Sequence, residues 1–330
     1  MNGREEKEFK KHNSIIIKLS NKPNYMLSWY NYLISQGMTE VSCEDYINKV
    51  LLFLSFINHD IRVIKLNEIT LQNVIDYMAT KSILNGEKSS DSYKQCIWSA
   101  LNNFFEFCVK NGLIQKNHML AIKRSGNKDL TRINANRVVI TEDNYRDIIK
   151  NVKNGVGSDK AKKAQQIMVN RNLTIFMLLM TTGMRISALI QINTNDIDLE
   201  NKKLVVTDKG NNTIEYVLSK DTYEYLSNWL SDRKKYNADS DALFITENGN
   251  RISNSAIDKM INKYCSSIVG RHMSAHKFRS GFCSINYQKT GNIEFVRRAV
   301  GHSNISTTQR YITTANDERK KSSELIDAIF

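Results

Sequence analysis

Apolar side chains recur at three- and four-residue spacing along most of the chain, as in helices with one buried face. In the first third of the chain this spacing predicts helices over 23–37, 41–58, 70–84 and 91–112. Pro23 is expected in the first turn of the first helix, and Ser42 and Asp45 have capping-box spacing in the second. One face of the fourth carries Ile97, Leu101, Phe104, Phe105 and Cys108. Together these helices predict a small helical module, residues 24–123.

Polar segments flank this module on both sides. Residues 1–23 are predicted to be a polar N-terminal lead-in. Residues 124–137, "RSGNKDLTRINANR", are polar and basic without periodicity, which predicts a linker that follows a phosphate backbone. A second domain is therefore expected over 138–330, with a C-terminal tail over 316–330.

The second domain has helical periodicity interrupted by a few strand-like runs. Helices are expected over 173–180, 220–235, 253–268, 276–289, 292–299 and 305–312. Two β-rich runs flank 208–212, where Gly and Asn favour a turn, and "ALFIT" predicts a short strand. With Pro23 as the sole proline, the chain is predicted to be mainly α with a small antiparallel β element.

Charge and composition narrow the partners and the compartment. Lys plus Arg exceed Asp plus Glu by 47 − 34 = 13, which favours a polyanionic partner such as nucleic acid, although a merely basic protein stays open. No apolar run approaches the roughly 20 residues of a membrane span, and the charged N-terminus does not have the pattern of a signal peptide. The odd number of cysteines, widely spaced, predicts core residues in a reducing cytoplasm: Cys43, Cys96, Cys108, Cys265 and Cys283.

Four short motifs carry residues suited to phosphodiester chemistry. They are "TTGMRISALIQI" with Arg185, "DKGNN" with Lys209, "AHKFRSGF" with His276 and Arg279, and "GHSNISTTQRY" with His302 and Tyr311. Each residue alone could have an ordinary structural role, as a surface charge, a member of a capping pair or a packed ring. The set stands out because every member lies at a turn or a helix start, in a basic protein without a metal-ligand pattern.

Such a set can run a metal-independent transfer reaction. Two guanidiniums can bind the non-bridging oxygens of a phosphodiester and stabilise the charge of the transition state. A tyrosine hydroxyl, with an ordinary pKa of about 10, needs a base or a cationic field, and a histidine provides either. A lysine on a hairpin can protonate the leaving sugar oxygen. The expected product is a covalent phosphotyrosine that a second DNA hydroxyl can attack.

The four motifs together resemble the conserved boxes of the tyrosine recombinases, the phage-integrase and Xer-type family, over roughly residues 24–315. The resemblance implies a SAM-like helical core-binding domain followed by a mixed α/β catalytic domain. It implies that Tyr311 is the nucleophile, Lys209 the general acid, and Arg185 and Arg279 the phosphate ligands. His276 would assist proton transfer and His302 would hydrogen-bond the phosphate, with no cofactor and no metal.

The resemblance also implies partners and leaves alternatives open. It implies a specific double-stranded DNA site, a homotetramer on two sites, and a cytoplasmic, nucleoid-associated protein; directionality or DNA-bending accessory proteins stay open. Integration and excision of a mobile element is the expected task, and Xer-type multimer resolution, type IB topoisomerase-like activity and a weakened DNA-binding regulator are alternatives. The family's usual acidic residue three positions after Arg185 is replaced by Ala188, which is the hint toward a regulator.

Overall fold

The structure is a computed structural model that describes residues 3–84, 87–124, 140–207, 213–236, 240–270, 272–302 and 304–309. The chain divides into two compact units, residues 1–128 and 129–330. Helices dominate both, and antiparallel strands form the small sheets, which confirms the predicted mainly α class. The division lies inside the range predicted as a linker, although residues 125–139 are outside the described ranges and the finer domain boundaries stay a prediction.

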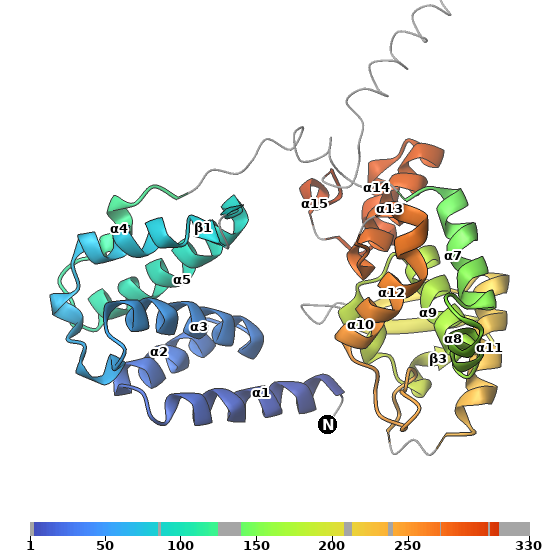
Figure 1. The fold of residues 1–330 in the computed structure, drawn as a ribbon, viewed down its shortest axis with the longest axis horizontal. Coiled ribbons are helices and arrows are strands. Elements are labelled where there is room, and N and C mark those ends of the chain that lie inside the picture. Colours follow the sequence, from blue (N-terminus) through green and yellow to red (C-terminus); the bar gives the residue numbers. More distant parts are fainter. Residues whose placement is uncertain are drawn as a thin grey trace, which may run out of the picture. The chain divides into compact units, whose positions relative to one another are not determined.

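The first unit is a helical module (Figure 1), and it has an apolar core of its own. Its elements are α1 (Gly3–Leu19), α2 (Asn24–Ser35), α3 (Glu40–Ile57), α4 (Leu71–Thr80), β1 (Ile83–Leu84), β2 (Glu87–Lys88) and α5 (Asp91–Lys110), with short 3₁₀ turns at Ile61–Val63, Leu66–Glu68 and His118–Ala121. The five apolar residues predicted to share one face of α5 are all buried, as that spacing requires.

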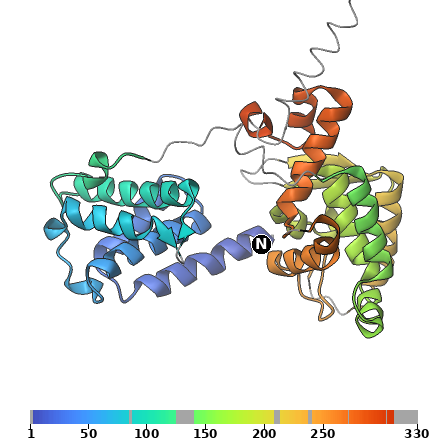
Figure 2. The same cartoon turned by 45° about the horizontal axis from the view of Figure 1, so that its top comes forward.

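The predicted lead-in over residues 1–23 is helical over most of its length. It contains α1, which lies along α2 and α3 in both views (Figure 1 and Figure 2). Ile15 and Leu19 of α1 are buried in the core of the unit. The high share of charged residues in the sequence of α1 obscures this narrow apolar stripe.

Two local predictions in the first unit are corrected by hydrogen bonds. α3 begins at Glu40, one residue before the predicted start, because the side chain of Thr39, and not that of Ser42, caps the helix: it accepts from the backbone N–H of Ser42 at 3.4 Å. Ser42 is therefore inside the helix, and Asp45 pairs with Lys49 one turn further on. The predicted helix over 70–84 ends at Thr80, because residues 83–84 pair with 87–88 as a short hairpin.

The second unit packs helices around the apolar helix α9, beside a small sheet. Its helices are α7 (Glu142–Asn154), α8 (Asp159–Gln166), α9 (Val169–Thr182), α10 (Ile186–Gln191), α11 (Lys220–Arg233), α12 (Asn254–Val269), α13 (Ala275–Thr290), α14 (Ile293–Ala299) and α15 (Ile305–Gln309), with a 3₁₀ turn at Thr194–Asp196. β3 (Ile197–Asp198), β4 (Lys203–Thr207) and β5 (Thr213–Val217) form an antiparallel sheet in sequence order. None of the described helices has the length and apolar character to cross a membrane.

The predicted strand "ALFIT" over 242–246 is a buried loop instead. It forms isolated bridges, and arginine side chains satisfy its carbonyl groups: Arg233 Nε donates to Ala242 O at 2.9 Å and Arg171 Nη1 to Ile245 O at 2.8 Å. The segment is apolar because it is buried, and a buried loop needs apolar side chains as much as a buried strand does. Its composition therefore resembled that of a strand.

Four of the five cysteines are buried core residues, as predicted. Cys96 differs, because it lies on an exposed face of α5. Burial raises the pKa of the Cys108 thiol to about 12 and that of Cys283 to about 11. These buried thiols are therefore protonated at neutral pH.

Candidate active site

The guanidinium of Arg279 joins three segments of the second unit. Arg279 lies on α13 with 1% of its surface exposed. Its Nη1 donates to Gly183 O at 2.8 Å, and its Nη2 donates to Val300 O at 2.7 Å. A buried charge is costly unless it is well hydrogen-bonded, so these bonds hold the three backbones in one arrangement. Gly183 precedes Arg185 by two residues, and Val300 precedes His302 by two.

Arg185 precedes α10 and follows a turn that requires glycine. Gly183 ends α9 with φ of 60°, and a Cβ there would lie 2.7 Å from the ring of Phe282 on α13. The turn is fixed further by Thr182, whose hydroxyl donates to Leu178 O at 2.6 Å. Arg185 is half-buried at the N-cap position of α10.

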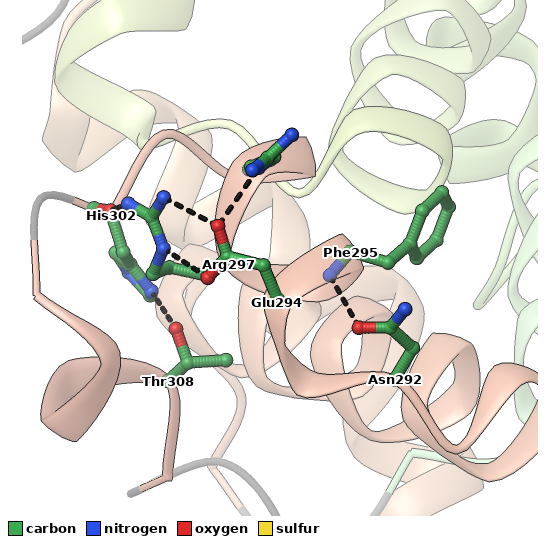
Figure 3. Close-up of polar contacts among 7 residues, drawn as sticks. Asn292, Glu294, Phe295, Arg297, His302 and Thr308 are labelled. Carbon is green, nitrogen blue, oxygen red and sulfur yellow. Dashed lines mark hydrogen bonds and ion pairs between the residues drawn. The ribbon is translucent and has the colours of Figure 1, made fainter.

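His302 lies in the loop after α14 and has 3% of its surface exposed. Its Nδ1 is 2.9 Å from the hydroxyl oxygen of Thr308 on α15, with the proton on one or the other atom (Figure 3). Thr308 is fully buried. Because Thr308 precedes Tyr311 by three residues, the imidazole is tied to the segment that leads toward the predicted nucleophile.

Gly301 brings the same loop against the hairpin that was predicted to carry Lys209. Its φ is 66°, and a Cβ there would lie 2.3 Å from Cδ1 of Ile214 on β5. The strands β4 and β5 pair up to Thr207 and Thr213, on either side of the predicted turn. Lys209 lies at 208–212 and Tyr311 at 310–330, both outside the described residues, so both assignments stay predictions.

His276 shares α13 with Arg279 but has a different environment. It is exposed in the first turn of the helix, and its backbone carbonyl accepts from Ser280 Oγ at 3.2 Å. Their three-residue spacing therefore does not give the two side chains equal burial. Ala188, where many family members carry an acidic residue, is 3% exposed on α10, and its N–H donates to Arg185 O at 3.0 Å.

Three residues that support this site are not marked by any of the four motifs as functional: Thr308, Arg297 and Glu294. Thr308 stood only as one hydroxyl among several in "SNISTTQRY". The three-residue spacing of Glu294 and Arg297 predicts an ion pair on a helix face, but not the further contact with the loop of His302. Across the described ranges, no group of three or more His, Cys, Asp or Glu side chains is arranged to hold a metal ion.

Comparison with known proteins adds an independent line of support. Residues 138–318 match the model of the phage integrase family. Tyrosine recombinase XerC of Alcanivorax borkumensis is 26% identical over 243 residues, 72% of this chain and 74% of that protein. XerC of Mannheimia succiniciproducens is 24% identical over 293 residues, 87% of this chain and 91% of that protein.

A solved structure supports the fold. XerH site-specific recombinase bound to palindromic difH substrate, in a post-cleavage complex, aligns with a TM-score of 0.67 and 19% identity. The alignment covers 88% of this chain and 82% of XerH.

Proposed function

The chain belongs to the phage integrase family of tyrosine recombinases, which are DNA strand-transfer enzymes, and we propose that it cuts and rejoins DNA at a specific site through a covalent 3′-phosphotyrosine. The observation that carries this proposal is the pair of hydrogen bonds from Arg279 to Gly183 O and Val300 O. These bonds bring together segments that belong to, or adjoin, three separate motifs. This arrangement is expected if the three motifs contribute to one site.

In the proposed reaction the hydroxyl oxygen of Tyr311 attacks the scissile phosphorus. The bond from phosphorus to the 5′-oxygen breaks, and the phosphate stays on the tyrosine. His276 assists removal of the tyrosine proton, a role that suits its exposed position in the first turn of α13. The energy of the broken bond is kept in the phosphotyrosine, so a 5′-hydroxyl of a second strand can reverse the step and complete the exchange.

Cationic and hydrogen-bonding groups stabilise the transition state in this proposal. Arg185 and Arg279 balance the charge on the non-bridging oxygens, and His302 donates a hydrogen bond to one of them. Lys209 protonates the leaving 5′-oxygen. The half-buried Arg185 is the more accessible of the two arginines, whereas Arg279 also holds the site's backbone together.

The proposed partner is a specific double-stranded DNA site. The net charge of +13 supports long-range attraction to phosphate, and the related fold of XerH is known in complex with a DNA substrate. We propose a homotetramer that holds two such sites, in a cytoplasmic, nucleoid-associated protein. Binding should then weaken steeply with added salt, as release of counterions from phosphates requires.

Two biological tasks fit this chemistry. We propose integration and excision of a mobile element as the first. Xer-type resolution of DNA multimers is the second, and the likeness to XerC over 87% of this chain favours it. Paired direct repeats at the two ends of one DNA segment would support excision, whereas a single cleaved site in each replicon would support resolution.

The deciding experiment is a search for covalent protein–DNA adducts. The full chain is incubated with supercoiled plasmids that carry a library of candidate attachment or repeat sequences, then denatured, with Tyr311→Phe as the matched control. An adduct on a 3′-phosphate that the control cannot form supports the proposal, and sequencing of the trapped DNA gives the site. Tight, salt-sensitive binding without any adduct would refute it in favour of a DNA-binding regulator, and Ala188→Glu would then be the first variant to test.

A further inference from the structure

We propose that Arg297 is a positioning residue for His302 and for the segment that leads to Tyr311, and that Glu294 holds Arg297 in place for this task. The inference rests on the proposed function. It concerns a contact between Arg297 of α14 and the backbone of His302, and Arg297 lies outside the four sequence motifs (Figure 3).

Arg297 holds His302 through both of its backbone polar groups. The N–H of His302 donates to Arg297 O at 3.0 Å, and Nη1 of Arg297 donates to His302 O at 2.5 Å. Fixing both groups restricts rotation of the backbone on either side of the His302 Cα. The first bond uses the main-chain carbonyl of residue 297, so the guanidinium of Arg297 supplies the second restraint on the direction in which the imidazole leaves the backbone.

Glu294 fixes the guanidinium that makes this contact. Nε of Arg297 donates to Oε2 of Glu294 at 2.7 Å, and Nη2 donates to Oε1 at 2.8 Å. A guanidinium is planar, so this two-point contact leaves Nη1 with one direction, toward His302 O. The pKa of Glu294 is lowered to about 2, first by Arg297 and then by Arg298, so the carboxylate stays ionised under assay conditions.

The contacts of Glu294 and Arg297 with the backbone of His302, here called the clamp, act through His302 on α15 and the segment that follows it. The imidazole meets Thr308 on α15 at 2.9 Å, and Thr308 is fully buried. If the backbone of His302 rotates, the bond to Thr308 is lost, and with it the contact that holds α15 against His302. Tyr311 follows α15 by two residues, so on the proposed function we expect a rotation at His302 to slow the attack by Tyr311.

The chain provides a matched control in the adjacent residue. Nε of Arg298 donates to the same Oε1 of Glu294 at 2.8 Å, but its side chain is 76% exposed compared with 26% for Arg297. Arg298→Gln removes the same charge from the same helix and leaves the contact between Arg297 and His302 O in place. A difference between the two variants therefore measures the clamp rather than the charge of α14.

The experiment measures single-turnover adduct formation by the full chain on the supercoiled plasmid library described above. DNA affinity and the thermal midpoint are measured in parallel. We expect Arg297→Gln to slow adduct formation about tenfold or more, the scale of losses when a group that orients a catalytic residue is removed. Affinity and thermal midpoint should stay near wild type. Arg298→Gln should cleave near the wild-type rate, and Arg297→Lys, which keeps one donor for His302 O, should recover part of the loss.

Several outcomes would overturn the inference. Wild-type cleavage by Arg297→Gln would do so, as would an equal loss in Arg298→Gln, or a loss fully explained by unfolding or weak DNA binding. If the wild-type chain forms no adduct, the proposed function fails separately. Hydrogen exchange of residues 296–309 then decides the clamp: faster exchange in Arg297→Gln than in Arg298→Gln supports it, and equal exchange refutes it.

Discussion

Replacing Arg279 with methionine should destabilise the second unit while leaving the first intact. Methionine keeps an unbranched apolar stem of similar length but has no donor for Gly183 O or Val300 O. Both carbonyl groups belong to buried residues. They would be left without the charged donor that satisfies them in the native structure.

The expected cost follows from the two lost bonds. A buried polar group left unsatisfied costs about 1–3 kcal/mol, so the two carbonyls together cost about 2–6 kcal/mol. Removing a buried charge recovers part of its desolvation, which favours the lower half of this range. For a unit of this size, about 2 kcal/mol corresponds to a fall of roughly 4–8 °C in the unfolding midpoint. Arg279→Lys, which can reach one carbonyl, should fall between the wild type and Arg279→Met.

Hydrogen exchange during urea titration measures the two units separately in the full chain. Peptides of α9 and α13 report on the second unit, and peptides of α5 serve as the internal control. We expect the unfolding midpoint of the second unit alone to shift. A contrary result would be an unfolding free energy of the second unit in Arg279→Met within about 0.5 kcal/mol of the wild-type value. The bonds to Gly183 and Val300 would then not hold the three segments together. The proposal that these segments form one site would lose its main support.

Three further predictions concern other contacts. Tyr30→Phe removes a buried hydroxyl that donates to Glu40 at 2.5 Å, and should lower the unfolding free energy of the first unit by about 1.5–3 kcal/mol in chemical denaturation. The pKa of Glu294 is lowered from 4.5 to about 2, so its ionised carboxylate contributes stability that is complete above pH 4.5 and is lost as the pH falls through 2. Carboxyl NMR titration should show this pKa rising when either arginine partner is removed. An unchanged pKa would contradict the assigned bonds. Gly301→Ala should slow adduct formation more than Gly270→Ala, because both have positive φ but only the added Cβ at Gly301 meets a side chain, on β5; equal rates would show that this close approach does not matter.

Much of the fold could be predicted because its signals are local. The buried face of α5 follows from i, i+4 spacing within one helix, and Gly183 marks the end of α9 through its own backbone preference. The predictions that failed depended on competition between local signals. Thr39 replaces Ser42 as the cap of α3, and the apolar segment 242–246 is a loop whose carbonyls are satisfied by distant arginines.

The same distinction applies to the candidate site: motifs identify the candidate residues, but only the fold shows their hydrogen-bond partners. Residue type and order pointed to Arg279 and His302 as reactive groups, because phosphate chemistry needs cations and proton carriers at fixed places. Their bonds to backbone carbonyls and to Thr308 depend on the packing of α13, α14 and α15, and carbonyls look the same at every position of a sequence. A residue that holds another by its backbone therefore has no motif of its own. Arg297 holds the backbone of His302, a proposed catalytic residue, so it is found among the partners of His302 rather than among the charged residues of the four motifs.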